Sequence, residues 1–426
     1  MARESVAECG GLWGARMRRF AVLPGILSIL LLTILGGSPA GGAVEKPPEA
    51  SDAWAEQLAL LTDSERLLMT GLEALSRQDL DRALDEFDRL VRQRPDFRLA
   101  RLIYGDLLLA RAGALRRFGG TAPPDSEEFT QLLEEARSRV LNMVEHPRKG
   151  TIPEPLLYLA KQQTHAIIVD LSKSRLYLFE RNRGRPEMVG NYYISSGRNG
   201  ADKTQAGDKR TPVGLYFITD YLPGRDLPDL YGIGALPINY PNEWDRLNRR
   251  SGYGIWLHGT PTETYSRPPR SSDGCVVLTN QDFQTLGEAV GIGTPVMITN
   301  TLDWLDPREW KGQLEWFLAR IDQWHKDWTS RNPERVLRHY SQAFQNGTFD
   351  YSGWSRHVRL LFQQGAGEED AFSDMSVLGY PADLPMVVVT YTTRKRGADL
   401  RGHAMRRQYW RQESDDAWKI VYEDTG

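Results

Sequence analysis

The chain has 426 residues, of which 40% are hydrophobic and 26% are charged. This composition is ordinary for a globular protein with two or three domains, and it excludes an intrinsically disordered chain. The formal net charge of -3 provides no basic field for nucleic acid, and the seven histidines and two cysteines are too scattered for a zinc framework, so we predict neither a nucleic-acid partner nor a metal.

The N-terminus has the pattern of an export signal. Three arginines, at positions 16, 18 and 19, precede an apolar run over residues 20–35, and small residues follow over 36–43. The apolar run of about 16 residues is short for a membrane span. We therefore predict that residues 1–43 are a signal peptide, with an uncleaved N-terminal anchor as the alternative, and that the protein works in the periplasm or cell envelope.

Export would also change the number of cysteines. Cleavage near Ala40 or Ala43 would remove Cys9 and leave Cys275 as the only cysteine of the mature chain, so that no disulfide could form within it. A lone thiol in an oxidising compartment is commonly either buried or used as a nucleophile. Cys275 is therefore a candidate catalytic residue.

Residues 51–150 are predicted to be helical. Apolar residues recur at helical spacing from Leu80 to Val91, Pro95 ends this run, and a second helix is expected over residues 97–112. Two successive amphipathic helices resemble a tetratricopeptide unit. Only about one and a half units are visible, whereas repeat arrays generally need three, so a small helical hairpin is the alternative.

Residues 161–301 are predicted to form one compact, mainly β domain. The apolar period changes to two from His165 onward, and residues 166–169 and 175–179 are expected to form a hairpin. Strand-like segments continue through a glycine-rich turn region as far as residue 299.

Residues 310–426 begin with helical patterns and end with three predicted strands, over 386–392, 401–411 and 418–422. Helices followed by a long antiparallel hairpin and a terminal strand resemble the cone-shaped nuclear transport factor 2 fold. Such a module can be a dimeriser, a ligand cup or an enzyme, so the resemblance assigns no activity. The terminal modules could bind a protein partner or form a dimer. The whole chain is thus expected to be a multidomain α+β protein.

The chemistry-bearing residues lie close together within the β domain. The sequence Trp-Leu-His-Gly-Thr contains His258, and Ser-Ser-Asp-Gly-Cys contains Cys275, 17 positions later. A free thiol has a pKa of about 8.5, so a cysteine nucleophile benefits from an imidazole that takes its proton. Gly274 allows a sharp turn before the thiol, and the amides of that turn could face a developing oxyanion.

This arrangement resembles the catalytic domain of the L,D-transpeptidases, also called the YkuD domain. The resemblance rests on the His-Gly pair, the spacing, the S-x-G-C sequence followed by aliphatic residues, and Thr-Pro-Val-Gly-Leu-Tyr over residues 211–216. It implies that Cys275 is the nucleophile, that His258 is the general base oriented by the carbonyl of Gly259, and that no cofactor is needed. The implied reaction passes a peptidoglycan stem peptide through a thioester on Cys275.

The sequence departs from the family pattern at two positions. Asp273 stands where the usual S-H-G-C has a second histidine, and Val277 stands where an arginine or asparagine is usual. The Asp273 carboxylate could hold the His258 imidazolium or meet the amine of an acceptor stem, but a carboxylate near a thiol also raises the thiol pKa. Ser272, Asp273 and Gly274 are therefore candidates for orienting the nucleophile or binding the oxyanion.

Two arginines precede the cysteine on the same loop. Arg267 and Arg270 could clamp the carboxylates of stem peptides, since the guanidinium group suits bidentate contacts with carboxylates. The alternative is that they are solvated loop charges.

We therefore expect a peptidoglycan L,D-transpeptidase in cell-wall crosslinking and remodelling. One alternative is a hydrolase or amidase that releases or attaches a lipoprotein at the stem peptide. The other is a catalytically idle protein that keeps the fold as a wall-binding scaffold.

Overall fold

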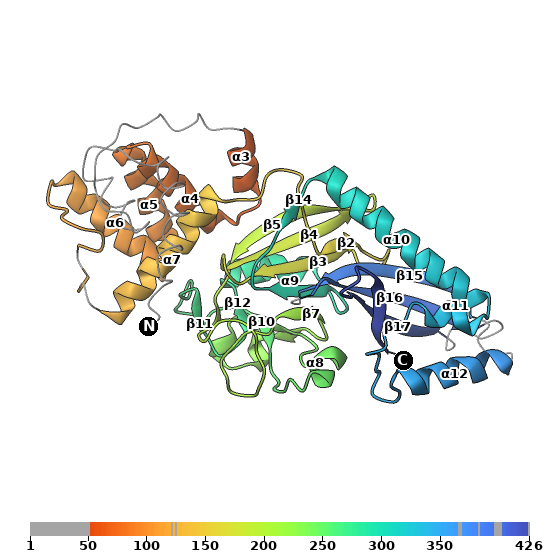
Figure 1. Cartoon of the computed structure of the whole chain (residues 1–426). Coiled ribbons are helices and arrows are strands. Elements are labelled where there is room, and N and C mark those ends of the chain that lie inside the picture. Colours follow the sequence, from red (N-terminus) through yellow and green to blue (C-terminus); the bar gives the residue numbers. More distant parts are fainter. Residues whose placement is uncertain are drawn as a thin grey trace, which may run out of the picture. The chain divides into compact units, whose positions relative to one another are not determined.

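The computed structural model describes residues 52–120, 122–123, 126–364, 369–381, 384–395 and 403–424. These residues form two compact units (Figure 1). The helical unit runs to His146 and also takes in Glu263–Pro269, and the main unit contains Pro147–Thr262 and the chain from Arg270 onward. The predicted signal peptide or anchor and Cys9 lie outside the described residues. Within the described ranges, no helix combines the length and the apolar character that crossing a membrane requires.

The helical unit is built from amphipathic helices that surround buried aromatic side chains such as Phe87 and Phe97. Its helices are α3 (Asp52–Ala59), α4 (Asp63–Ser76), α5 (Leu80–Gln93), α6 (Arg98–Arg111) and α7 (Glu127–Val144). The predicted pair corresponds to α5 and α6. Helices α4 and α7 also lie within residues 51–150, the range predicted to be helical, although their individual bounds were not predicted; both carry buried charges, among them Glu65 and Arg139.

The first part of the main unit is the expected β domain. β3 (His165–Asp170) and β4 (Arg175–Asn182) form the predicted hairpin. They belong to a five-stranded sheet with the order β5-β4-β3-β13-β7. The other strands of that sheet are β5 (Arg185–Tyr193), β7 (Gly214–Phe217) and β13 (Pro295–Thr299).

A second sheet of the same domain has the order β12-β10-β9-β8 and carries the candidate site. Its strands are short: β8 (Leu222–Pro223), β9 (Gly234–Pro237), β10 (Trp256–His258) and β12 (Val276–Val277). A further two-stranded sheet joins β6 (Ser196–Gly197) to β11 (Arg270–Ser272). Helices α8 (Glu243–Leu247) and α9 (Asn280–Ala289) complete the domain.

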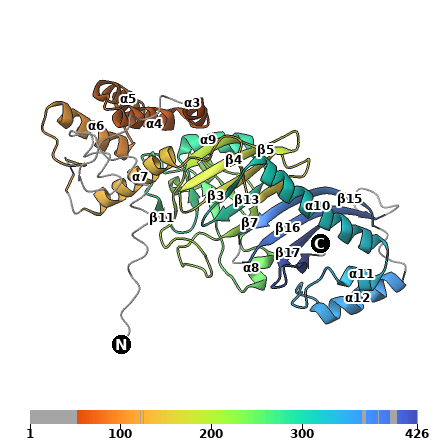
Figure 2. The ribbon, with the colours of Figure 1, turned by 45° about the horizontal axis from the view of Figure 1, so that its top comes forward.

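The C-terminal part of the main unit is an α+β region in which α10 crosses the sheet (Figure 2). Its elements are α10 (Pro307–Thr329), α11 (Pro333–Leu337), α12 (Tyr351–Gln363), β15 (Glu369–Tyr380), β16 (Met386–Lys395), β17 (His403–Gln412) and β18 (Trp418–Asp424). The last three strands were predicted, whereas α12 and β15 were not. A register shift between Ser373 and Ser376 interrupts the period of two in β15 and hides the strand in the sequence. The N-terminal helices, β domain and C-terminal α+β region confirm the predicted fold class.

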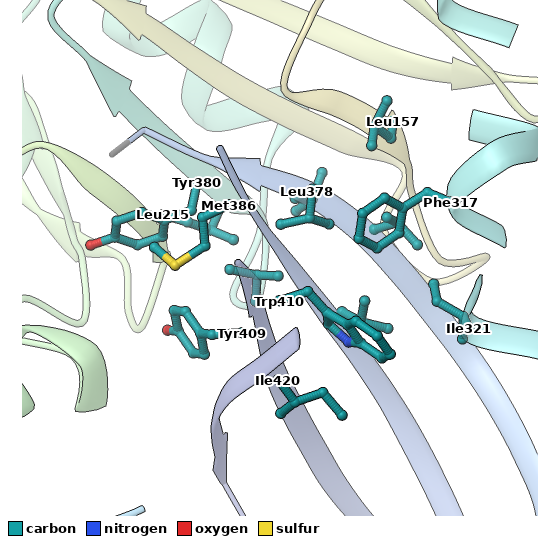
Figure 3. Packing of buried hydrophobic residues seen from close by; sticks show 14 of the residues in the cluster. Leu157, Leu215, Phe317, Ile321, Leu378, Tyr380, Met386, Tyr409, Trp410 and Ile420 are labelled. Atoms are coloured by element: carbon teal, nitrogen blue, oxygen red, sulfur yellow. The ribbon is translucent and has the colours of Figure 1, made fainter. Parts of the chain in front are cut away.

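The β domain and the C-terminal region share one hydrophobic core. β2 (Leu156–Tyr158), from the start of the main unit, pairs with β15 and extends the C-terminal sheet. Phe317 of α10 packs on the sheet side chain Trp410, with ring centroids 6.2 Å apart (Figure 3). The short strands β1 (Ile152–Pro153) and β14 (Trp304–Leu305), which lie on either side of the β domain in the chain, also pair with each other.

Helix α8 joins the two parts of the main unit on the other face of the C-terminal sheet. Its Trp244 ring stacks on Tyr409 with centroids 5.0 Å apart and an interplanar angle of 13°. The Glu243 carboxylate of α8 forms an ion pair with Arg407, with an N–O distance of 3.3 Å. The residues that follow α8 lead directly into β10, so this interface lies immediately before the candidate site in the chain.

Candidate active site

Parallel pairing of two short strands brings the predicted base and nucleophile to one place. β10 ends at His258, and β12 begins directly after Cys275. In the register of this pair, Leu257 lies opposite Val276 and His258 lies opposite Val277. The backbone N–H of Leu278 donates to the carbonyl of His258 at 2.9 Å and prolongs the pairing. Cys275 is therefore two residues from the position that faces His258.

The turn before Cys275 is fixed by hydrogen bonds to small polar side chains. The Ser272 hydroxyl accepts from the N–H of Gly274 at 3.1 Å and donates to the carbonyl of Cys275 at 2.7 Å. The Thr211 hydroxyl donates to the carbonyl of Gly274 at 3.0 Å and accepts from the N–H of Gly197 at 2.8 Å. Thr211, predicted only as the start of a strand, thus also supports the turn.

Gly274 cannot be replaced without strain. Its φ is +127°, in the region that side chains disfavour, and a Cβ at this position would lie 2.7 Å from the carbonyl oxygen of Arg210. The turn leaves Cys275 partly exposed, and its thiol donates to the carbonyl of Gly254 at 3.4 Å. The Cys275 thiol is therefore accessible and its side chain has a defined direction.

His258 is 3% exposed and is oriented by its neighbour. Its Nδ1 lies 2.7 Å from the carbonyl oxygen of Gly259, which can only accept, so Nδ1 carries the proton. Nε2 is then the basic nitrogen of the neutral ring. This is the contact that the family resemblance implies for Gly259.

Asn280, at the start of α9, holds the backbone that follows His258. Its side-chain NH2 group donates to the carbonyl of Thr260 at 2.8 Å, and its Oδ1 accepts from the N–H of Ile233 at 3.2 Å. A Cβ on Gly259 would lie 2.1 Å from that Oδ1 atom, so the glycine lets the amide approach. No sequence signal pointed to Asn280.

Tyr231 is a second site residue that the sequence did not reveal. It ends the short 3-10 helix η3 (Asp229–Tyr231), and its ring meets the His258 ring edge to face, with centroids 5.0 Å apart and an interplanar angle of 73°. Burial, and second the negative charge of the Cys275 thiolate, raise the pKa of the Tyr231 phenol. Tyr231 therefore lies near both His258 and Cys275.

The carboxylate of Asp273 is paired with an arginine. Arg198 Nη2 lies 2.7 Å from Asp273 Oδ1, and the Arg198 backbone N–H donates to the carbonyl of Ser272 at 2.9 Å. Both side chains are exposed, at 47% and 71%. The guanidinium offsets the charge of the carboxylate, although solvent weakens an exposed pair.

The two arginines proposed as carboxylate clamps belong to different units. Arg270 is exposed and begins β11 in the main unit, whereas Arg267 lies in the stretch Glu263–Pro269 of the helical unit. Among the described residues, no group of three or more His, Cys, Asp or Glu side chains could hold a metal ion. The side chains described at the site supply a thiol, an imidazole, a phenol and an ion pair.

Two stretches of the chain match known protein families. Residues 164–298 match the model of the L,D-transpeptidase (YkuD) catalytic domain. Residues 316–424 match the model of the Cds6 C-terminal NTF2-like domain. The chain therefore carries an L,D-transpeptidase-family catalytic domain followed by an NTF2-like domain, as both resemblances in the sequence implied.

Two solved structures share the fold over most of their own length. Bd1075 from Bdellovibrio bacteriovorus is 23% identical with a TM-score of 0.54, and the match covers 64% of this chain and 98% of that one. The helical cell shape determining protein Pgp2 from Campylobacter jejuni is 20% identical with a TM-score of 0.55, and the match covers 64% of this chain and 95% of that one. No curated protein matches the chain. At these identities the likeness shows the fold alone.

Proposed function

We propose that this protein is a cysteine acyltransferase of the cell envelope that acts on peptidoglycan stem peptides through a thioester on Cys275. The observation that supports the proposal is the pairing of β10, which ends at the oriented His258, with β12, which begins directly after the partly exposed Cys275. The family of the catalytic domain acts on such stems. The predicted export over residues 1–43 and the envelope location belong to the same proposal.

The first half-reaction uses His258 as a general base. Its Nε2 takes the thiol proton, and the Cys275 thiolate attacks the carbonyl carbon of the third residue of a tetrapeptide stem. In this proposal, other backbone amides of the Ser272–Cys275 turn stabilise the oxyanion, since the N–H of Gly274 already donates to the Ser272 hydroxyl. When the tetrahedral intermediate collapses, the bond to the terminal D-alanine breaks and the imidazolium returns its proton to the leaving nitrogen.

The second half-reaction releases the acyl group. Nε2 now takes a proton from the attacking amine of a neighbouring stem, the new amide forms, and the thiolate leaves and is reprotonated. Attack by water at the same carbon would instead give a shortened stem. The proposed outcome is transfer to an amine, and wall remodelling of this kind fits the fold shared with Pgp2, a protein named for its role in helical cell shape.

The test follows the covalent intermediate by mass spectrometry. The purified protein should form one adduct with a carbapenem, and Cys275→Ala should form none while it keeps the melting behaviour of the parent. His258→Ala should still fold but alkylate at Cys275 much more slowly at neutral pH, because the thiolate loses its partner. A wild-type protein that forms no adduct would instead support the idle scaffold.

Defined muropeptides then distinguish the products. A crosslinked dimer with loss of D-alanine supports the proposed transferase, whereas a tripeptide product alone assigns the same site to hydrolysis. Products that persist in Cys275→Ala would overturn the mechanism altogether.

A further inference from the structure

The peptide that connects the base to the nucleophile has an unusual location. Between His258 and Cys275, the seven residues Glu263–Pro269 are part of the helical unit, while both flanks belong to the main unit. The helical unit is also outside the residue ranges of both family matches except for this stretch. We call Glu263–Pro269 the connecting segment.

Tyr265 anchors the connecting segment in the core of the helical unit. Its side chain is completely buried, and its ring packs on Phe97 of the helical unit with centroids 4.2 Å apart. The Arg94 guanidinium lies 4.8 Å from the centre of the same ring. The Tyr265 hydroxyl donates to Glu65 at 3.4 Å. An aromatic side chain buried on all sides is costly to withdraw, so Tyr265 fixes the segment to the helices.

Ser266, the next residue of the connecting segment, hydrogen-bonds to a network of buried charges in the helical unit. The guanidinium of Arg139 is fully buried and pairs with both Glu65 and Glu135, which are 1% and 2% exposed. The Ser266 hydroxyl donates to Glu135 at 2.6 Å. Buried charges are stable only when their hydrogen-bonding capacity is satisfied. Ser266 supplies one of those hydrogen bonds. The buried charges of the helical unit therefore keep all of these hydrogen bonds only when the connecting segment is in place.

The two flanks of the segment lead to the reacting groups. On one side, Thr262 donates to Asp229 from its N–H at 3.1 Å and from its hydroxyl at 2.5 Å. Asp229 begins the 3-10 helix that ends at Tyr231, whose ring packs on His258. On the other side, the chain enters β11 and then the turn that presents Cys275. Each end of the connecting segment is therefore joined to one partner of the catalytic pair.

We propose that the helical unit is a scaffold for the active-site loop and that Tyr265 and Ser266 are positioning residues for the acyl-transfer site. By holding the connecting segment, they fix the flanks at Thr262 and Arg270 and thereby the approach of the His258 imidazole to the Cys275 thiol. The inference rests on the proposed function of Cys275 and gives the N-terminal helices a role in the reaction, in place of the partner-binding role considered from the sequence.

The experiment compares Tyr265→Ala with Phe87→Leu. Phe87 is equally buried in the helical unit, but its ring lies against Gly71 rather than against the connecting segment. The rate of Cys275 alkylation by iodoacetamide is measured from pH 5 to pH 10, with kcat and KM on muropeptides and the unfolding transition of each variant. Tyr265→Ala should slow neutral-pH alkylation about tenfold and move its pH profile toward that of a free thiol. Its kcat should fall up to about 10²-fold, with KM changed much less.

A second variant removes the risk that Tyr265→Ala simply unfolds the helices. Inserting Gly-Ser-Gly after Thr262 and again after Pro269 leaves Tyr265 and Ser266 in place. The insertions lengthen the chain on both sides of the connecting segment, so that the segment no longer fixes Thr262 and Arg270. The proposal expects this variant to lose kcat and shift its alkylation profile like Tyr265→Ala, whereas Phe87→Leu stays within about twofold of the parent.

The outcomes separate this inference from the proposed function. An alkylation profile that is the same in the parent, Tyr265→Ala and the insertion variant would overturn the positioning role, even if muropeptide turnover is confirmed. A parent that turns over no muropeptide would refute the proposed function, yet the alkylation profiles would still test the positioning role. Equal losses in Phe87→Leu and Tyr265→Ala would mean that only the stability of the helical unit matters and would also overturn the inference.

Discussion

The active-site strands and the NTF2-like sheet are held together in different ways. β10 and β12 have three and two residues, and the site around them is fixed by hydrogen bonds from Thr211, Ser272 and Asn280 to the backbone. β15, β16 and β17 have 12, 10 and 10 residues and pack large aromatic side chains. The difference suggests that polar substitutions at the site alter chemistry more than stability, whereas substitutions in the sheet do the reverse.

The largest effect on stability is expected in the sheet. Trp410 is 1% exposed, packs edge to face on Phe317 and donates from its indole N–H to Gln408 at 3.0 Å. Trp410→Ala should lower the free energy of unfolding by about 3–5 kcal/mol, measured by urea denaturation, because it leaves a cavity in the shared core. The alkylation rate of Cys275 in the folded protein should not change.

Trp316→Ala is the matched control, because its side chain is 43% exposed. Trp316→Ala should lower the free energy of unfolding by about 1 kcal/mol or less. If Trp410→Ala slowed alkylation of the folded protein as well, the contrast between the two regions would fail and the sheet would have to be counted as part of the site.

A smaller loss of stability but a clear loss of reactivity is expected at Thr211. Thr211→Val keeps the shape of a fully buried side chain but leaves the N–H of Gly197 and the carbonyl of Gly274 without their partner. Thr211→Val should lower the free energy of unfolding by about 1–3 kcal/mol. Because the Gly274 carbonyl directly precedes Cys275, alkylation should also slow, by about tenfold.

Thr219→Val controls for the substitution itself, since the Thr219 hydroxyl bonds a carbonyl at 3.2 Å in an exposed setting. Thr219→Val should change neither the free energy of unfolding nor the alkylation rate of Cys275 appreciably. Loss of stability in Thr211→Val without slower alkylation would show that the turn keeps its geometry without this hydroxyl.

These contrasts also explain how much of the molecule could be predicted from the sequence. Cys275, His258 and Gly259 were found because they lie on two short, neighbouring motifs, and the β3–β4 hairpin because its apolar period is regular. The geometry agrees with the implied orientation of His258, while the roles assigned to the site residues remain predictions. The domain boundaries also remain predictions, with domains at residues 1–43, 51–150, 161–301 and 310–426.

The remaining site residues could not be predicted for a physical reason. Arg198, Tyr231 and Asn280 reach the site from other elements of the fold, and a single arginine, tyrosine or asparagine carries no periodic signal. Likewise, nothing in the pattern of Glu263–Pro269 shows that it packs among the helices. Long-range contacts of this kind follow from the tertiary structure and are not encoded by local spacing.

Acid should affect the loop beside the site through Asp208. Burial acts to raise the pKa of this carboxyl, but the Lys203 ammonium and three backbone N–H groups outweigh it and lower the pKa from 3.8 to about 2. The folded pKa is below the unfolded value, so this stabilisation is complete above pH 3.8 and is lost as the pH falls through about 2.

Asp208→Asn should therefore lower the free energy of unfolding at pH 7 by about 2 kcal/mol. The difference from the parent should narrow as the pH is lowered from 4 toward 2, measured by urea titrations at each pH. Asp226→Asn, whose side chain is 64% exposed, serves as the control and should show no such pH dependence. A constant difference between Asp208→Asn and the parent would mean that the carboxylate charge is not what stabilises the loop.

The smallest expected effect is at the Arg198–Asp273 ion pair, where the sequence departs from the pattern of the L,D-transpeptidase domain. Arg198→Ala would leave the Asp273 carboxylate without its 2.7 Å partner and so raise the pKa of the neighbouring thiol. Alkylation of Cys275 at neutral pH should slow by about two- to fivefold, the range of an exposed ion pair. Asp273→Asn removes the carboxylate itself and should not slow alkylation.

The double variant, Arg198→Ala with Asp273→Asn, should recover the rate of Asp273→Asn alone, because the guanidinium then has no carboxylate to offset. The release step gives a second measurement: if the Asp273 carboxylate also meets the incoming amine, Asp273→Asn should slow amine-dependent release of the acyl group more than it slows carbapenem acylation. Equal losses in both steps would restrict Asp273 to a structural role in the turn. Additive losses from the two single substitutions would show that the pair does not tune the thiol, and the site would then depend only on the hydrogen bonds that shape its backbone.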